Sequence, residues 1–420
     1  MKKLMMTALF LGTVLTINAQ VETKAECDKQ HAGCTHQAGC AKQEGCTKHE
    51  GCSKQEGCAK KATIEVPAWV KNIKFSGYGI LQYQATDQKD AKSNTFNLRL
   101  ARFILDGKIG DFDWRAQIQG TNLKGGAEPT VQLVDLYAEW VKYKEARIRV
   151  GQFKRCFTYE NPTHPITQGW RGYADVINRL SGFGDRAGEK SSGGRDIGIQ
   201  LQGDLFPASD GHRYLHYQVG IYNGEGINQK DKDNRKDVIG GIWVSPIKGL
   251  RVGAFGWTGS HGNMVVGKDL AGNDITASVP LNRYALSAEY STGEYMFRAE
   301  YVHSQGWGVA PAYVGKGGNV IDYTLGEKAD GWYAFGIVPI IKGKLHAKAR
   351  YQVYRPTKTW EGRVNADGVL VGGAINSYEA GLNYFFTKNL EMHLEYAHIN
   401  ERTAKKHNYN LVDVELAFRF

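Results

Sequence analysis

Long apolar segments are missing from this sequence beyond its N-terminal region. A helix that crosses a membrane needs about 18 or more consecutive apolar residues, and no segment after residue 20 supplies them. The mean hydropathy of −0.44 is also that of a soluble protein. Together these features exclude a helical membrane protein.

Proline is scarce too, with 10 residues in 420, whereas Gly (51), Tyr (22), Phe (16) and Trp (9) are plentiful. Proline interrupts β-ladders, and aromatic residues favour strands and membrane interfaces. The balance suits long antiparallel strands, either in a membrane barrel or in a secreted all-β protein.

Cysteine is almost absent from the main part of the chain. Six of the seven cysteines lie before residue 60, and only Cys156 follows. We therefore expect the main domain to fold without disulfide bonds.

The first residues have the order typical of a secretory signal peptide. Lys2 and Lys3 precede an apolar run over residues 4–15, and Ala19 offers a small residue for cleavage. We expect residues 1–19 to be removed after export. Gln20 rather than Cys follows the cleavage point, so the mature chain is not expected to carry a lipid anchor.

Residues 20–62 form a low-complexity segment in which Gly-Cys pairs recur every six residues, at positions 39–40, 45–46, 51–52 and 57–58. We expect a flexible periplasmic segment. Its thiols suit soft metal ions, and the candidate ligands are Cys34, Cys40, Cys46, Cys52 and Cys58. The spacing differs from the Cys-x-x-Cys pairs of structural zinc sites. Disulfides in any of 15 connectivities are the alternative for the six thiols.

From about residue 73 the dominant pattern is alternation of apolar and polar residues, which is the period of a strand with two different faces. Residues 344–354 show it most clearly. One face carries Leu345, Ala347, Ala349, Tyr351 and Val353, and the other carries Lys344, His346, Lys348, Arg350 and Gln352. One face suits lipid and the other suits water, although the strands of a soluble sandwich alternate in the same way.

Three observations favour a membrane barrel over residues 63–420. Sixteen candidate strands lie near residues 73–84, 94–109, 112–122, 130–143, 146–156, 195–206, 213–223, 236–244, 249–259, 281–291, 294–306, 329–340, 344–355, 374–386, 389–398 and 408–420. Short connections alternate with long ones, including 260–280, 307–328 and 356–373, as periplasmic turns alternate with external loops. The last strand ends in Phe420, which resembles the signal recognised by the outer-membrane barrel assembly machinery.

Lipid offers no hydrogen bonds to backbone groups, so a sheet within the membrane must close on itself. We therefore predict an all-β fold, a transmembrane antiparallel β-barrel of about 16 strands, in the outer membrane of a Gram-negative bacterium. A barrel of this size leaves a water-filled lumen.

Alternation also predicts which cationic side chains face the lumen. They are Arg115, Arg147, Arg149, Arg251, Arg298, Lys348 and Arg350. Arg99 and Arg102 can both face inward only if their strand contains a bulge. Pairing with carboxylates is an alternative role for such cations, and the predicted partners are Asp135, Glu139, Glu300, Glu391 and Glu395.

The longest connection, residues 157–194, falls between the fifth and sixth strands. It carries Arg171, Arg179, Arg186 and Lys190 together with Asp175, Asp185 and Glu189, and residues 174–180 suit a short helix. A mixed-charge surface loop is one interpretation. We predict instead that this third loop folds into the lumen and brings Arg171 and Arg179 near a constriction.

Several segments resemble the phosphate-selective porins O and P. They are residues 151–154 (Gly-Gln-Phe-Lys), 195–201 (Arg-Asp-Ile-Gly-Ile-Gln-Leu), 218–224 (Gln-Val-Gly-Ile-Tyr-Asn-Gly) and 384–390 (Tyr-Phe-Phe-Thr-Lys-Asn-Leu). Residues 155–157 (Arg-Cys-Phe) depart from the family pattern, which often has an apolar residue and proline there. The resemblance covers about residues 73–420. It implies a homotrimeric channel that passes phosphate or polyphosphate along a ladder of arginines and lysines.

We therefore predict a channel for passive diffusion of small anions, including phosphate or polyphosphate, with the seven lumen cations, Arg171 and Arg179 along the anion path. A general porin without phosphate selectivity is one alternative. A barrel enzyme is another, although no Gly-x-Ser-x-Gly motif occurs. We expect no catalytic residues and no cofactor. The net charge of +10 favours anions only mildly, and no basic cluster with interleaved aromatics points to nucleic acid.

The position of the Cys-rich segment outside the strand pattern leads to a first prediction. A variant that lacks residues 20–62 should still fold in detergent into a barrel whose gel mobility changes on heating. A variant that stays unfolded would show that the segment belongs to the fold.

Overall fold

A computed structural model describes residues 72–88, 92–120, 131–182, 193–268, 271–306, 327–356, 358, 363–364, 370–371, 373–402 and 408–420. All of them belong to one compact unit, Glu65–Phe420. The expected signal peptide and the Cys-rich segment lie outside the described residues.

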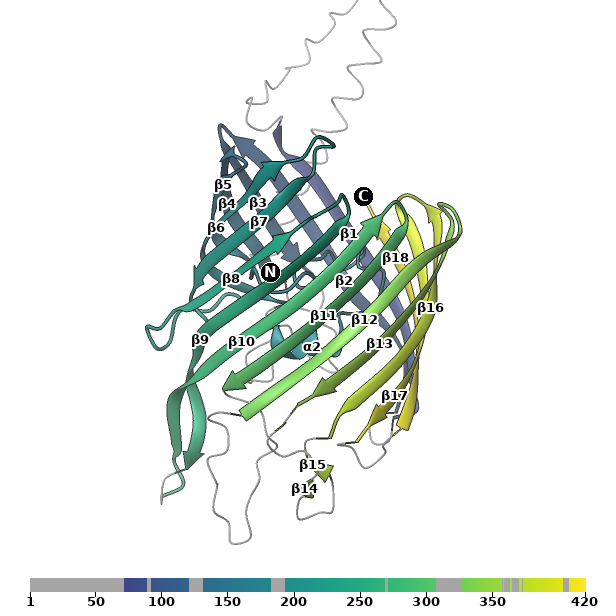
Figure 1. The fold of residues 1–420 in the computed structure, drawn as a ribbon. Helices are drawn as coiled ribbons and strands as arrows, with labels where there is room; N and C mark the ends of the chain where they lie inside the picture. The colour runs from purple at the N-terminus through teal and green to yellow at the C-terminus, as the bar shows by residue number, and fades with distance from the viewer. Residues whose placement is uncertain are drawn as a thin grey trace, which may run out of the picture. The chain divides into compact units, whose positions relative to one another are not determined.

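Sixteen antiparallel strands close into one barrel (Figure 1). They are β1 (Lys74–Thr86), β2 (Ser93–Ile109), β3 (Phe112–Gln119), β4 (Gln132–Tyr143), β5 (Ala146–Lys154), β6 (Arg195–Pro207), β7 (Arg213–Tyr222), β8 (Asp237–Val244), β9 (Leu250–Lys268), β10 (Asp274–Thr292), β11 (Tyr295–Gly306), β12 (Glu327–Ile341), β13 (Leu345–Arg355), β16 (Ile375–Thr387), β17 (Leu390–Glu401) and β18 (Asn408–Arg419). The short strands β14 (Arg363–Val364) and β15 (Leu370–Val371) form a separate sheet. The predicted barrel is confirmed.

The two faces of the strands are inverted relative to a soluble protein. In β13 the polar side chains of Lys348, Arg350 and Gln352 are buried. Apolar side chains on the other face of the barrel are exposed, such as Val150 at 52% and Ile221 at 48%. An apolar exterior around a polar interior is what a barrel in lipid requires. The soluble sandwich considered as an alternative is therefore wrong.

The predicted bulge between Arg99 and Arg102 is confirmed. Ile80 pairs with Leu100 but the next residue, Leu81, pairs with Leu98, so the register shifts by one residue on β2. The extra residue lets both arginines face inward. Arg99 Nη1 then lies 2.7 Å from the Glu415 carboxylate, and Arg102 Nε donates to Gln119 Oε1 at 2.8 Å.

The predicted long connection over residues 260–280 is wrong. Strands β9 and β10 continue through most of it, and they pair as far as Lys268 and Asp274. Gly272, with φ +84, adopts the left-handed conformation that a short turn needs and that glycine tolerates. The hairpin therefore extends further than its polar sequence suggests.

The barrel closes between its first and last strands. Phe420 and Gly77 exchange two backbone hydrogen bonds, at 3.0 and 3.1 Å. The Phe420 ring packs near Phe75 and Phe103, at centroid distances of 5.8 and 6.1 Å. A side chain on Gly77 would lie 2.5 Å from that ring, so only glycine permits this contact.

None of the helical segments in the described part of the chain has the length and apolar character that a membrane-crossing helix needs.

Candidate functional site

The connection between β5 and β6 crosses the interior of the barrel. Its helix α2 (Asp175–Leu180) contacts β11, β12 and β13. In the order of strands around the barrel, β13 lies opposite β5. The contacts are made with inward-facing side chains, as in the hydrogen bond from the Asp175 backbone N–H to Gln352 Oε1 at 2.8 Å. Figure 1 shows α2 behind the strands of the near wall.

Apolar packing holds this loop against the wall. Phe157, Trp170 and Ile177 are fully buried in one cluster with wall residues that include Trp257, Phe335 and Tyr354. Trp170 lies 5.8 Å from Phe335 between ring centroids. Each buried side chain of this size contributes roughly 1.5–3 kcal/mol. The loop is thus packed as a protein core is packed, within an otherwise polar interior.

Glu300 binds the loop backbone, which corrects its predicted role as the partner of a wall cation. Its carboxylate accepts hydrogen bonds from the N–H groups of Tyr159 at 2.7 Å and Glu160 at 2.8 Å. The neighbouring Arg298 pairs instead with Glu289, at 2.7 Å. Alternation placed Glu300 in the lumen correctly, but it could not show that the loop covers it.

Lys348 and Arg350 lie beneath the loop and not along open water. Their side chains are 0% and 1% exposed, and they pair with Glu395 and Glu379. Lys348 Nζ donates to the Gly169 carbonyl at 2.7 Å, and Arg350 Nη1 donates to the Gly172 carbonyl at 3.0 Å. Both cations also contact the face of Trp170, at 4.9 and 4.6 Å. These two residues therefore anchor the loop.

The other predicted lumen cations all face inward, and each pairs with a carboxylate. The shortest pairs are Arg115 with Asp106 (2.7 Å), Arg147 with Asp204 (2.7 Å), Arg149 with Glu139 (2.6 Å) and Arg251 with Glu289 (2.9 Å). Of the other predicted partners, Asp135 pairs with Arg195 (2.7 Å) and Glu391 with Arg419 (3.0 Å).

The two loop arginines, Arg171 and Arg179, differ in their partners and in their exposure. Arg171 donates its backbone N–H to Glu395 at 2.6 Å, and its guanidinium lies 3.6 Å from Glu379. Arg179 is exposed on the last turn of α2. The predicted charges at 185, 186, 189 and 190 lie outside the described residues.

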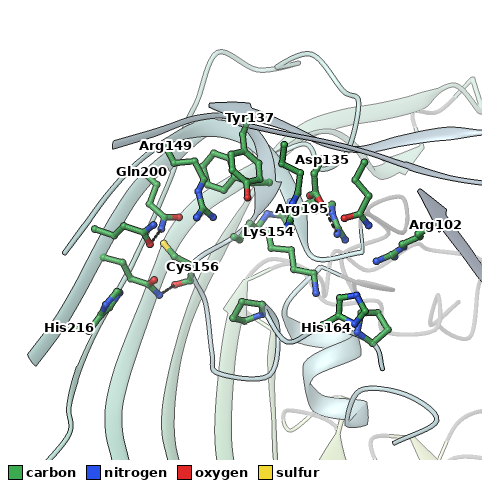
Figure 2. Close-up of a pocket in the computed structure, with 18 of the residues that line it drawn as sticks. Arg102, Asp135, Tyr137, Arg149, Lys154, Cys156, His164, Arg195, Gln200 and His216 are labelled. Carbon is green, nitrogen blue, oxygen red and sulfur yellow. Dashed lines mark hydrogen bonds and ion pairs between the residues drawn. The ribbon is translucent and has the colours of Figure 1, made fainter. Parts of the chain in front are cut away.

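A cavity of about 350 Å³ lies between the loop and the wall formed by β2 to β8 (Figure 2). Six of its lining residues are cationic and one is acidic: Arg102, Arg115, Arg149, Lys154, Arg155 and Arg195, with Asp135. We call this space the basic cavity. Of the predicted anion path, it includes Arg115 and Arg149.

Arg102, Lys154 and Arg195 gather where the loop leaves β5 and rejoins β6 (Figure 2). Lys154 Nζ donates to the carbonyls of Asn161 at 2.8 Å and Thr163 at 2.9 Å. Arg102, 8% exposed, donates to two neutral oxygens, Tyr78 Oη at 2.9 Å and Gln119 Oε1 at 2.8 Å. Of the other four cations, Arg195 pairs with Asp135, while Arg115, Arg149 and Arg155 pair with Asp106, Glu139 and Asp196, which are not part of the lining. The surface that faces the cavity is therefore mainly cationic.

Sequence reasoning did not select Lys154, Arg155 or Arg195 as site residues. Lys154 and Arg195 stand at the two ends of the longest connection, within the segments that carry the family resemblance. Their position beside the loop entrance is the signal that could have identified them.

His164 supplies a neutral hydrogen-bonding group to the basic cavity. Its Nδ1 accepts the Ile166 N–H at 3.3 Å, which leaves Nε2 to carry the proton. Burial, together with the nearby Lys154 and Arg102, lowers the pKa of His164 to about 3. The imidazole is therefore an uncharged donor across the physiological pH range.

Among the described residues, no group of three or more His, Cys, Asp or Glu side chains is arranged to hold a metal ion. The candidate thiolate ligands of the Cys-rich segment lie outside them.

The family model described as phosphate-selective porin O and P matches residues 76–241 and 274–420. The chain belongs to this family. No match was found among curated protein sequences.

Solved porins share the fold of this porin at low identity. The anion-selective porin from Comamonas acidovorans has a TM-score of 0.56 and 10% identity, covering 83% of this chain and 99% of that chain. The outer membrane channel DcaP of Acinetobacter baumannii has a TM-score of 0.56 and 11% identity, with coverages of 83% and 97%. The trimer form of OmpT from Vibrio cholerae has a TM-score of 0.52 and 14% identity, with coverages of 83% and 99%.

Glu160 makes the attachment of the loop sensitive to pH. One carboxylate oxygen accepts the Ala174 N–H at 3.1 Å, and the other is buried without a hydrogen-bond partner among the described residues. Burial is the main cause that raises its pKa to about 7, with Arg350 and Arg298 opposing and Glu300 adding to the effect. Because the folded state favours the protonated form, the stabilisation is present in acid and is lost as the pH rises through about 7.

We expect the open-channel current of this porin to become noisier between about pH 5 and about pH 8, because ionisation of Glu160 loosens the loop. The Glu160→Gln variant should remain quiet over that range in planar bilayers. Glu145→Gln, in an exposed turn, is the control. Equal pH dependence in wild type and Glu160→Gln would contradict this role.

Proposed function

We propose that this member of a porin family conducts small anions by passive diffusion and that phosphate is among them. The basic cavity is the observation that carries this proposal, because six cationic residues line it against one carboxylate. We propose a channel and not an enzyme because the matching family is one of porins.

Fixed charges attract a counter-ion most strongly in a narrow, partly desolvated space. Arg remains protonated at neutral pH, and its planar guanidinium can donate two hydrogen bonds to one oxyanion. Field lines concentrate where low-dielectric walls approach each other, so charges in the cavity matter more than charges at the rim. The proposed anion path therefore runs past Arg102, Arg115, Arg149, Lys154 and Arg195.

A general porin without phosphate selectivity is the second candidate. The ion pairs of Arg147, Arg149 and Arg251 favour it, because a carboxylate beside each guanidinium weakens its long-range field. The covered positions of Lys348 and Arg350 favour it as well.

We also propose that residues 1–19 are removed on export, that the Cys-rich segment lies in the periplasm, and that the barrel assembly machinery inserts the chain into outer-membrane lipid. The signal-peptide pattern supports removal of residues 1–19 on export. The alternating strand pattern supports insertion into the outer membrane.

We propose that the channel is a homotrimer, as one similar porin has been described in a trimer form. The exposed apolar residues of the outer wall suit contact with a neighbouring barrel as well as with lipid. Light scattering of the detergent-solubilised protein should give the mass of three chains after correction for detergent. A mass of one chain at all concentrations would contradict the trimer.

Replacing Arg102 and Arg149 together with Gln should lower the preference for anions over cations by about ten-fold, because two fixed positive charges leave the lining of the basic cavity. The zero-current potential in a potassium chloride gradient measures this preference. Lys388→Gln, in an exposed turn between β16 and β17, is the matched control. If the double variant and the control behave alike, the cavity does not set selectivity.

A further inference from the structure

The basic cavity is larger than an inorganic oxyanion needs. Its volume of about 350 Å³ falls in the range of roughly 300–1,000 Å³ that is typical of pockets for organic ligands. An inorganic oxyanion would fill only part of this volume. The rest of the cavity can hold the organic part of a larger anion.

The lining of the cavity changes from one end to the other (Figure 2). Arg102, Lys154, Arg195 and His164 gather at one end, and Gln200 and His216 lie at the other. Gln202, which accepts a hydrogen bond from Gln200 at 2.8 Å, and Trp243, which stacks on His216, line the same end. Gln218 also lines the cavity and donates to the Cys156 carbonyl at 3.2 Å. An amide can both donate and accept a hydrogen bond, which matches the needs of a hydroxyl group.

Two polar side chains of the cavity have hydrogen-bonding groups without a partner among the described residues. Gln117 is 4% exposed and lines the cavity, and its side-chain amide forms no hydrogen bond with a described residue. His216 pairs through Nδ1 with Asp204 at 2.7 Å, while its Nε2 is buried without a partner in the described part of the chain. Buried polar groups are normally satisfied, so the Gln117 amide and His216 Nε2 indicate where a ligand would bind.

Trp243 holds His216 in place and adds an apolar surface. The two rings stack with centroids 3.7 Å apart. Tyr137 is also in the cavity wall, and the Arg149 guanidinium lies over its ring, 4.6 Å from the ring centroid. Aromatic faces beside amides suit the C–H surface of a sugar ring or a similar polyol, which inorganic phosphate does not have.

We propose that the basic cavity is a binding subsite for a hydroxylated organic anion, such as a sugar phosphate or a sugar acid. The anionic group binds at the end formed by Arg102, Lys154 and Arg195, and the hydroxyl groups bind Gln117, His216 and the neighbouring amides. This inference rests on the proposed anion-channel function and adds the class of solute. Glucose 6-phosphate and glucuronate represent the two possible head groups.

The test is block of chloride current through the full-length channel in planar bilayers. Glucose 6-phosphate or glucuronate should reduce the current at a concentration about ten-fold lower than inorganic phosphate or glucose requires, since two additional hydrogen bonds contribute roughly that factor. Equal potency of the organic anions and phosphate would overturn the proposal. If only one of the two organic anions blocks more strongly than phosphate, that result identifies the head group.

Gln117→Leu separates this proposal from the general attraction of anions. The variant should lose the advantage of the organic anion over phosphate and should keep the wild-type zero-current potential, because no charge changes. Gln305→Leu, on the exposed face of β11, is the matched control. A Gln117→Leu channel that still prefers the organic anion would overturn the proposal.

His216→Phe provides a second variant if Gln117→Leu fails to insert, because it keeps the stacked ring and removes the unpaired nitrogen. It should also lose the advantage of the organic anion, and an unchanged preference would overturn the proposal. A wild-type channel that prefers cations in the potassium chloride gradient would refute the proposed function itself. An anion-selective wild type without the preference for organic anions would refute only this subsite.

Discussion

The whole architecture depends on the requirement that backbone amides in lipid find partners within the protein. The sheet meets this requirement by pairing β1 with β18, and closure then separates the two faces of every strand. The apolar face must meet lipid, and the polar face must meet the lumen. Charged side chains such as Arg149 and Glu139 are therefore inside because of strand periodicity, before any role in transport is considered.

The loop between β5 and β6 divides these interior charges into two groups. On the side of β11 to β17, cations and carboxylates are covered by the loop and bind its backbone, as Lys348, Arg350 and Glu300 do. On the side of β2 to β8, the charges line a cavity that the loop leaves open. The same residue types thus attach the loop on one wall and line the open cavity on the other.

Periodicity in the sequence was enough to predict the strands, their inward faces and the bulge at Arg99, because a period of two is a local property of the chain. It also predicted the short helix of the loop. It could not show that Trp170 covers Lys348 and Arg350, because that contact joins segments far apart in the chain. The basic cavity was missed for the same reason: Lys154 and Arg195 become neighbours only when β5 pairs with β6.

Pairing between the first and last strands has a consequence for how the barrel forms. Tyr78 pairs with Arg419, so this contact has one of the largest sequence separations that the chain allows. Until β18 arrives, β1 has an unpaired edge, and such edges readily pair with the wrong strand or with another chain. An exported chain must therefore be shielded along its full length, and its vulnerable period ends in a single late event.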